Sequence, residues 1–254
     1  MNQIVILAAG KGTRMGSDLP KVLHPVQGVP IIEQILRNTR SLVEKPVVVV
    51  GHGREQVMAA LGDRVSYVHQ AEQLGTGHAV RCAREALQTL GVTRVLVTPG
   101  DHPLISTATF ERMLSTLAET GATVVLASVV VPDFDGDNAQ FAHFGRIVRG
   151  ADGAVDRIVE YKDATEVERA IREVNTSYYC FDAAWLWDAL DRLNDNNAAH
   201  ELYLTDMIQF ARDDGHTVAV YTIEDPIEGL GINTPEQLAL IERYCRERDT
   251  IAGS

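Results

Sequence analysis

Apolar runs rich in β-branched residues alternate with segments of helical periodicity along the first half of the chain. Short apolar runs bounded by turn residues are typical of strands, and apolar residues recurring every three to four positions indicate a helix face. These runs predict strands at Ile4–Ala8, Val47–Val50, Val65–His69, Arg94–Thr98 and Thr123–Val131. Helices are expected at Ile31–Ser41, Arg54–Leu61, Gly77–Leu90 and Thr107–Thr120. The alternation predicts an α/β fold with a mostly parallel, doubly wound sheet and helices on both faces.

The second half of the chain is less regular. Arg146–Val148 and Val155–Tyr161 predict a hairpin, because an Asp-Gly pair between them supplies the positive φ that a tight turn requires. Further strands are expected at Val174–Phe181 and Val218–Thr222, and further helices at Ala184–Leu193 and Thr205–Arg212. A last helix should begin after Thr234 as N-cap, with Pro235 in its first turn and Gln237 completing a capping box. Since no linker or repeat divides the sequence, residues 1–254 are expected to form one domain.

Charge and hydropathy limit the classes of partner. The chain has 254 residues and a net charge of −12, and such a surface repels nucleic acid. A membrane partner is not expected either, since no apolar run approaches the roughly 20 residues of a spanning helix. Residues 1–24 have a positive net charge, unlike the rest of the chain, because they contain Lys11, Arg14 and Lys21 but only one acidic residue, Asp18. A basic island in an acidic protein indicates a small anionic ligand.

The cysteines and the start of the chain predict a cytoplasmic location. Cys82, Cys180 and Cys245 are odd in number and far apart, which is typical of reduced thiols. The only apolar stretch near the start, Ile4–Ala9, follows no basic residue and runs directly into a glycine-rich segment. This pattern is not that of a signal peptide.

The loop after the first predicted strand reads Leu7-Ala8-Ala9-Gly10-Lys11-Gly12-Thr13-Arg14-Met15. Its small residues let backbone N–H groups approach a phosphate chain, whose charge Lys11 and Arg14 can neutralise. Met15 stands where a dinucleotide fingerprint needs glycine, and no segment has the Walker A spacing. Lys21 follows a proline, which stiffens the segment and could hold the ammonium toward the same phosphates. The alternatives are a turn without a ligand and a solvated surface lysine.

This loop and the following Ser17-Asp18-Leu19-Pro20-Lys21-Val22-Leu23-His24 closely resemble the opening of the sugar-1-phosphate nucleotidylyltransferases. Among these, the match is best to the pyrophosphorylase domain of the bifunctional N-acetylglucosamine-1-phosphate uridylyltransferases. The resemblance implies a Rossmann-like doubly wound mixed sheet, the nucleotide-diphospho-sugar transferase fold, with a small β-rich insertion on the sugar side. It also implies transfer of UMP from UTP to N-acetylglucosamine 1-phosphate, giving pyrophosphate and UDP-N-acetylglucosamine for cell-envelope polysaccharides such as peptidoglycan.

The resemblance assigns the nucleotide to two segments. It implies that Leu7–Gly12 and Lys21 surround the phosphates. The second segment, Gln70-Ala71-Glu72-Gln73-Leu74-Gly75-Thr76-Gly77-His78-Ala79, is similar to the family's uracil-reading segment, in which Gln70, Gly75 and Thr76 hold the base. An amide can pair donor with acceptor at a pyrimidine edge. On its residues alone, this second segment could instead be a loop leading into a helix. The implied catalytic residues are Arg14, Lys21 and Asp101.

Gly100-Asp101 follows the predicted strand Arg94–Thr98, at the end where open α/β sheets bind ligands. An aspartate there can hold Mg²⁺, which takes one or two protein oxygens together with substrate phosphates, or it can form a local turn. The resemblance favours Mg²⁺, because Asp101 matches the family's metal-binding aspartate and Asn233 matches its companion ligand. Asn233 could instead only precede the cap of the last helix.

On the sugar side, the resemblance implies contacts from Gly100, Gly145, Glu160, Asn175, Tyr203 and Thr205. The sequence departs from the family on this side: Pro99 replaces a common tyrosine, Ser177 replaces a usual glycine, and Asp133–Phe144 is longer than usual. Another sugar 1-phosphate is therefore the nearest alternative substrate. The alternative from a different class is a non-catalytic nucleotide-binding regulatory protein.

The family's full-length enzymes continue into a left-handed β-helix with acetyltransferase activity. This sequence reaches Ser254 before any hexapeptide repeat, so acetyl transfer is not expected of this polypeptide. The expected partners are UTP and an amino-sugar 1-phosphate, and the sequence carries no signal for the oligomeric state.

Overall fold

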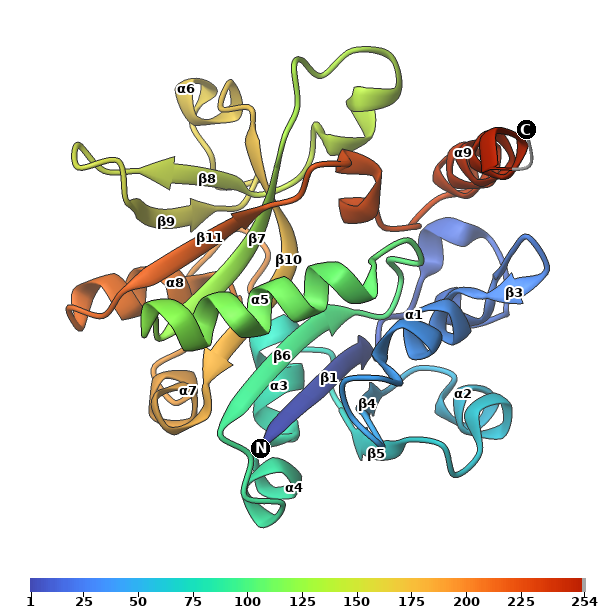
Figure 1. The fold of residues 1–254 in the computed structure, drawn as a ribbon, viewed down its shortest axis with the longest axis horizontal. Coiled ribbons are helices and arrows are strands. Elements are labelled where there is room, and N and C mark those ends of the chain that lie inside the picture. The colour runs from blue at the N-terminus through green and yellow to red at the C-terminus, as the bar shows by residue number, and fades with distance from the viewer. Residues whose placement is uncertain (253–254) are drawn as a thin grey trace.

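A mixed β-sheet forms the centre of the computed structural model, which describes residues 1–252 and the side chains of residues 1–248 (Figure 1). The strands of this sheet are β1 Asn2–Ala8, β4 Val47–Val50, β5 Ser66–His69, β6 Arg94–Pro99, β7 Val124–Val130, β8 Arg146–Arg149, β9 Val155–Val159, β10 Glu173–Asp182 and β11 Val218–Thr222. Their order is β11–β7–β10–β6–β1–β4–β5, and the hairpin of β8 and β9 joins through β10. A separate small sheet pairs β2 Pro25–Val26 with β3 Val29–Pro30.

Helices cover both faces of this sheet. They are α1 Ile31–Thr39, α2 Arg54–Leu61, α3 Thr76–Cys82, α4 Arg84–Thr89, α5 Thr107–Thr120, α6 Glu166–Arg169, α7 Ala183–Leu190, α8 Asp206–Asp213 and α9 Pro235–Ala252. Short 3₁₀ turns occur at Thr13–Met15, Lys21–Leu23, Gly136–Phe141 and Pro226–Gly229. The predicted helix at Gly77–Leu90 is wrong as a single element. It is divided at the fully buried Ala83, whose N–H bonds to the carbonyl of Val80 in a tightened turn.

The sheet has a parallel half and a mixed half. β6, β1, β4 and β5 run parallel, as the alternation of strands and helices predicts, whereas β10 lies antiparallel between β6 and β7. A mixed, Rossmann-like sheet is therefore confirmed, and the hairpin of β8 and β9 pairs as predicted. β10 returns from the second half of the chain into the middle of the sheet. Residues of β10 thereby reach the same edge as the loops after β1 and β6.

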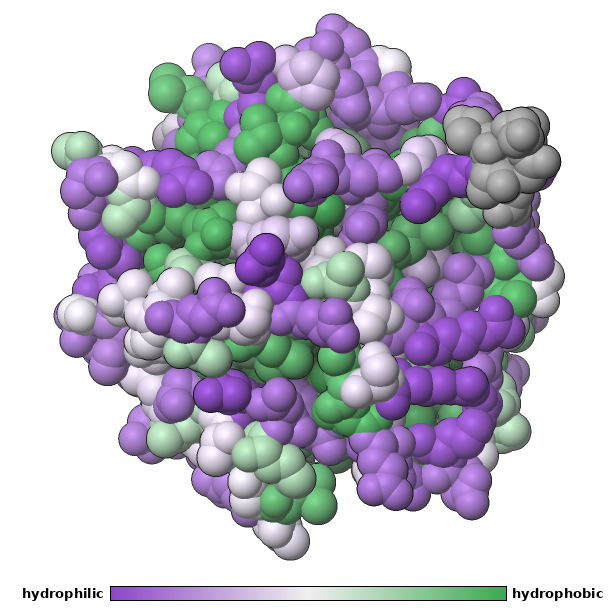
Figure 2. All heavy atoms as spheres, viewed as in Figure 1, coloured by the Kyte–Doolittle hydropathy of each residue, from purple (hydrophilic) through white to green (hydrophobic). Residues whose placement is uncertain are grey.

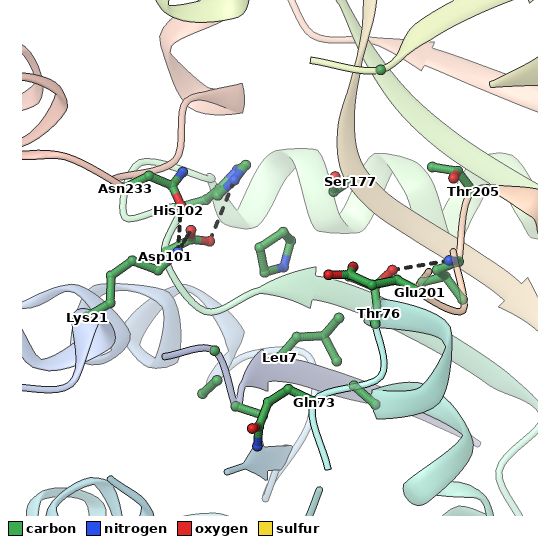
Figure 3. Close-up of a pocket in the computed structure, with 18 of the residues that line it drawn as sticks. Leu7, Lys21, Gln73, Thr76, Asp101, His102, Ser177, Glu201, Thr205 and Asn233 are labelled. Atoms are coloured by element: carbon green, nitrogen blue, oxygen red, sulfur yellow. Dashed lines mark hydrogen bonds and ion pairs between the residues drawn. The ribbon is translucent and has the colours of Figure 1, made fainter. Parts of the chain in front are cut away.

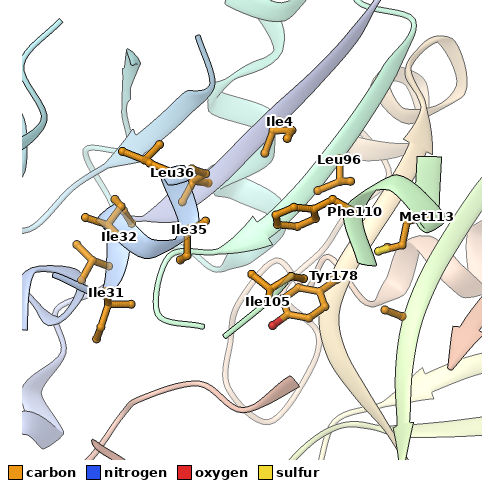
Figure 4. Close-up of a cluster of buried hydrophobic side chains, with 14 of the residues drawn as sticks. Ile4, Ile31, Ile32, Ile35, Leu36, Leu96, Ile105, Phe110, Met113 and Tyr178 are labelled. Atoms are coloured by element: carbon orange, nitrogen blue, oxygen red, sulfur yellow. The ribbon is translucent and has the colours of Figure 1, made fainter. Parts of the chain in front are cut away.

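Two apolar clusters, one on each face, hold the layers together. On one face, α1, α2 and α5 pack side chains such as Ile35 and Phe110 against the sheet (Figure 4). Ile241 of α9 extends the same cluster toward β2. The other face is covered by α3, α4, α7 and α8, with Leu87 and Leu190 fully buried. These clusters fix the positions at which the strands end, and therefore the loops that carry the polar residues described below.

Polar residues cover most of the surface seen in Figure 2, and apolar side chains show mainly in the recesses between elements. No helix in the part of the chain that the structure describes is both long and apolar enough to pass through a bilayer.

Candidate functional site

A cavity of about 520 Å³ opens where β1 and β6 end, beside the glycine-rich loop. This is the edge at which open α/β sheets place their ligands. The cavity collects candidates from both halves of the sequence. Those that line it are Leu7, Ala8, Ala9, Gly10, Arg14, Lys21, Gln70, Gly75, Thr76, Asp101, Gly145, Glu160, Asn175, Thr205 and Asn233.

Within the cavity, one ammonium group joins two residues that are far apart in sequence. Lys21 Nζ donates to Asp101 Oδ2 and, at 2.8 Å, to Asn233 Oδ1 (Figure 3). Arg14 donates to the same oxygen of Asn233 at 3.0 Å. A carboxylate oxygen and an amide oxygen therefore converge on one positive charge, between the loop after β1 and the segment before α9.

Two hydrogen bonds fix the backbone around Asn233. The N–H of Ile232 donates to the carbonyl of Asp101 at 2.9 Å, and the N–H of Asn233 donates to Gln237 Oε1 at 2.7 Å. Thr234 accepts from the N–H of Gln237 at 3.3 Å, as an N-cap should. The predicted capping box is wrong in its second half, because Gln237 reaches back to Asn233 instead of Thr234. The start of α9 therefore also positions a candidate ligand.

A buried histidine forms the wall next to Asp101. His102 Nδ1 lies 2.8 Å from the hydroxyl of Tyr178, and that hydroxyl donates to the carbonyl of Glu228 at 2.6 Å. The Tyr178 phenol has one proton and donates it to Glu228, so His102 Nδ1 must carry a proton of its own. His102 Nε2 is then an acceptor, and it lies 3.7 Å from Asp101 Oδ1. Burial lowers the pKa of His102 to about 4, so the ring is neutral at pH 7.

The segment that leads to Asn233 is tied to this wall. A Cβ on Gly231 would lie 2.4 Å from His102 Nε2, so only glycine allows this approach. The carboxylate of Glu228 accepts from the N–H of Ser106 at 3.2 Å and from the hydroxyl of Thr109 at 2.7 Å. The turn at Pro226–Gly229 is thereby fastened to the start of α5.

The two oxygens that accept from Lys21, on Asp101 and Asn233, are of the type that binds a hard cation. Burial would raise the pKa of Asp101, but the adjacent Lys21 ammonium outweighs it and holds that pKa below its usual value, so the group is a carboxylate. Its partner oxygen, on Asn233, is also a hard ligand. Among residues 1–248, no cluster of three or more His, Cys, Asp or Glu side chains could hold a metal ion. A cation at Asp101 and Asn233 would therefore need further oxygens from substrate or water.

Four candidates from the sequence do not line the cavity. Lys11 is exposed, and Tyr203 directs its hydroxyl to Asp163 Oδ2 at 3.5 Å. Gly12, at φ 61°, packs so closely that a Cβ would lie 2.8 Å from Cβ of Lys21. The N–H of Gly100 donates to the carbonyl of Leu7 at 2.8 Å. The two glycines thus support the loop rather than face a ligand.

Gln70 presents mainly its amide oxygen to a ligand. Its side chain is buried, and Nε2 donates to the carbonyl of Gly75 at 3.1 Å and lies 3.1 Å from His78 Nδ1. Thr76 accepts from the N–H of Leu204 at 3.1 Å, which joins this segment to the loop before α8. The amide nitrogen is thus engaged inside the loop, and the oxygen is the atom with which Gln70 can accept from a base.

The opposite wall comes from the second half of the chain. The N–H of Asn175 donates to the carbonyl of Gly145 at 2.9 Å, and the hydroxyl of Thr205 donates to Glu160 Oε1 at 3.3 Å. Burial, reinforced by the nearby carboxylates of Asp163 and Asp206, raises the pKa of Glu160 to about 7. This carboxyl can therefore both donate and accept hydrogen bonds near neutral pH.

Several lining residues were not among the sequence-based site residues. In the sequence, Pro99 and Ser177 stand out only as departures from the family, and His102 follows the candidate metal ligand Asp101 directly. Tyr179 could have been found from the alternation of β10, since it shares a face with Asn175 and Ser177. The remaining lining residues are Val22, Gln73, Ala79, His143, Phe144, Glu201 and Leu204. Val22, Gln73 and Ala79 lie within the two segments that resemble the family, whereas no motif in the sequence marks His143, Phe144, Glu201 and Leu204.

Comparisons with known proteins identify the family and the fold of this chain. A family model described as a MobA-like NTP transferase domain matches residues 4–204. Proteins named "Bifunctional protein GlmU" from Brevibacillus brevis and Bacillus velezensis are 46% and 45% identical to this chain over 96% of its length. The chain spans 51% and 52% of those two relatives. A solved structure from Bacillus anthracis, provisionally named a glucose-1-phosphate thymidylyltransferase, has a TM-score of 0.75 at 17% identity, covering 97% of this chain and 96% of that one.

Proposed function

We propose that this chain, which belongs to the family of MobA-like NTP transferase domains, transfers UMP from UTP to N-acetylglucosamine 1-phosphate. An oxygen of the sugar phosphate attacks the α-phosphorus of UTP, the bond from that phosphorus to the β-phosphate oxygen breaks, and pyrophosphate leaves. The observation that carries the proposal is the cluster of Lys21, Asp101 and Asn233 beside the glycine-rich loop. The GlmU relatives at 45–46% identity support this choice of substrates.

The protein's own part in this reaction is positioning and charge stabilisation. A phosphate monoester is already ionised near neutral pH, so the attacking oxygen needs no general base. Arg14 and Lys21 line the cavity next to the loop and can stabilise the charge that builds up on the departing pyrophosphate. Backbone N–H groups of Ala9 and Gly10 can approach the triphosphate because their side chains are small. Proximity and preorganised charge can together supply most of the rate enhancement in phosphoryl transfer.

A divalent cation, for which we propose Mg²⁺, would be held by Asp101 and Asn233. Such a cation supplies charge neutralisation between phosphate oxygens. The Lys21 ammonium contacts both of these oxygens in this structure. This contact supports the proposal that the same two oxygens can bind a metal cation. Cation binding would accordingly require Lys21 to turn toward the phosphates, where it meets the negative charge of the nucleotide.

We assign the base to the segment with Gln70, Gly75 and Thr76. The amide nitrogen of Gln70 is occupied by Gly75 and His78, so its oxygen can accept from the N3–H of uracil. Cytosine has an acceptor at N3, which would lie against the acceptor oxygen of Gln70 without forming a hydrogen bond. UTP is therefore expected to be preferred over CTP.

The sugar would lie against Gly145, Glu160, Asn175 and Thr205. Tyr203, which lies outside the cavity, would support this wall through Asp163, and Gly100 would support the loop after β1 through Leu7. A second candidate is the same reaction with a different sugar 1-phosphate. It is favoured by the presence of Ser177 and Pro99 in the cavity lining, because both change the shape and polarity of the sugar side. A cytoplasmic location is part of this proposal, because Cys82, Cys180 and Cys245 are odd in number and far apart in the sequence.

The test is an assay of pyrophosphate release. The purified protein is incubated with Mg²⁺, one nucleoside triphosphate from UTP, dTTP and CTP, and one sugar 1-phosphate from a panel that includes N-acetylglucosamine 1-phosphate. The highest kcat/KM is expected for UTP with N-acetylglucosamine 1-phosphate. A higher value with another sugar would support the second candidate. Absence of pyrophosphate with every pair at saturating concentrations would contradict both.

A further inference from the structure

One residue in the cavity wall has a strained backbone. Among residues 1–252, the non-glycine residues with positive φ are Gln27 at 49°, Ser177 at 63° and His200 at 53°. L-residues avoid this region because Cβ approaches the following carbonyl, whereas glycine adopts it freely. Of the three, only Ser177 lines the cavity. Strain of this kind tends to occur at functional sites, where the surrounding structure enforces it.

The surroundings of Ser177 enforce this conformation. The pairing of β10 with β7 shifts register between Asn175 and Tyr179, so Ser177 sits in a bulge. Asn175 Oδ1 accepts from the N–H of Ser177 at 3.1 Å, and the hydroxyl of Thr176 donates to the carbonyl of Ala127 at 2.9 Å. Regular pairing of β10 with β7 continues on both sides of this bulge. A glycine would fit this bulge without strain, so the serine side chain serves something other than folding.

The side chain of Ser177 faces the cavity together with its neighbours at alternate positions. Asn175, Ser177 and Tyr179 all line the cavity, while Thr176 and Tyr178 bond to the carbonyls of Ala127 and Glu228 elsewhere in the fold (Figure 3). This wall is the one built by Gly145, Glu160 and Thr205, on the sugar side of the site. The Ser177 hydroxyl is therefore a polar group at the place proposed for the sugar.

The Ser177 hydroxyl lies beside other polar side chains of the same wall. Asn175 Oδ1 accepts from the N–H of Ser177, and Asn175 Nδ2 donates to the hydroxyl of Tyr179 at 2.7 Å. Burial raises the pKa of Tyr179, so the phenol keeps its proton. The Ser177 hydroxyl has one proton and two lone pairs, so it can form a hydrogen bond with a polar group of a ligand in the cavity.

We propose that Ser177 is a specificity-determining residue whose hydroxyl forms a hydrogen bond with a polar group of the bound sugar. This inference rests on the proposed function. It selects sugar 1-phosphates that carry a hydroxyl or acylamino group at this point over those that carry hydrogen there. The Cβ of Ser177 also makes the cavity narrower than a glycine at this position would, so it excludes sugars with bulky substituents at this point.

The experiment compares wild type, Ser177→Gly and Ser177→Ala. Steady-state kinetics are measured with UTP and with N-acetylglucosamine, glucosamine, glucose and galactose 1-phosphates, and thermal unfolding is followed in parallel. Both variants should raise KM for the preferred sugar phosphate about 3- to 10-fold, the size expected for one uncharged hydrogen bond, and leave KM for UTP within about twofold. Ser177→Gly alone should raise the unfolding temperature, because it alone removes the strain.

Gln27→Gly is the matched control, since Gln27 has the same kind of strained φ in the turn between β2 and β3, outside the cavity. It should raise the unfolding temperature and leave all sugar kinetics unchanged. The inference is overturned if Ser177→Gly and Ser177→Ala keep the wild-type ratios of kcat/KM across the sugars. If wild type itself uses no sugar 1-phosphate, the proposed function fails, and this inference fails with it.

Discussion

The ammonium of Lys21 lies 2.8 Å from the side-chain oxygen of Asn233, a residue 212 positions later in the chain. Asp101 completes the cluster from the end of β6. The loop after β1, the end of β6 and the start of α9 therefore share one small group of charges and hard oxygens. Replacing Lys21 or Asp101 therefore tests whether this cluster acts on the substrates.

Replacing Lys21 by alanine should lower kcat by two to four orders of magnitude. The ammonium would no longer stabilise charge on the triphosphate, and loss of one such preorganised group typically costs 10²- to 10³-fold or more. Pyrophosphate release measures the effect. Lys11→Ala is the control, since Lys11 is exposed outside the cavity and should change kcat by less than about threefold. Near-normal turnover of Lys21→Ala would remove Lys21 from the mechanism.

Asp101→Asn should weaken the response to divalent cations. The carboxylate is the only charged oxygen ligand in the proposed pair, so half-saturation by Mg²⁺ should rise at least about tenfold. Binding of Mn²⁺ to the enzyme with UTP, followed by electron paramagnetic resonance, should weaken in parallel. Asp18→Asn, at an exposed position near the same loop, should bind Mn²⁺ as wild type does. Equal Mn²⁺ affinity of wild type and Asp101→Asn would place the cation elsewhere.

Tyr178→Phe should lower the free energy of unfolding by about 1–3 kcal/mol. The change leaves the buried His102 Nδ1–H and the carbonyl of Glu228 without their partner, and unpaired buried groups cost this much. Urea unfolding provides the measurement. Tyr67→Phe removes a hydroxyl that donates to the carbonyl of Gly62 at 2.7 Å and lies 3.5 Å from that of Met58, at a more exposed site, so it should cost less. Equal losses for the two variants would argue against a coupled network.

Glu160 should make stability depend on pH between about 4.5 and 7. Its pKa is about 7 in the folded protein, against an ordinary value of 4.5, because burial disfavours the charged form. The folded state holds the proton more tightly, so the stability Glu160 contributes is complete below pH 4.5 and is lost as pH rises to 7.

Relative to Glu160→Gln, wild type should therefore lose on the order of 3 kcal/mol between pH 4.5 and 7.5. Urea unfolding at these two pH values measures the difference. Asp206, whose pKa is raised to about 6, is present in both proteins, so the comparison isolates Glu160. A difference that is the same at both pH values would show that Glu160 titrates normally.

Much of the fold could be predicted because its signals are local. Arg54–Leu61, Thr107–Thr120, Val47–Val50 and Val218–Thr222 form elements with the predicted bounds. The sequence does not predict the break at Ala83 within Gly77–Leu90, because neither proline nor glycine marks this position. Most of the candidate site residues line the cavity, since the glycine-rich loop and the carboxylate of Asp101 each follow a recognisable strand.

The amino-acid sequence by itself determined most strands and helices of the first half, the glycine-rich loop after β1 and the position of Asp101 at a strand end. These depend on neighbouring residues and on the period of apolar positions. Only the tertiary structure decided that β10 lies antiparallel between β6 and β7, that Lys21 meets Asn233, and that Ser177 adopts a left-handed conformation. Each of these follows from packing between segments distant in sequence, and short-range patterns do not specify it.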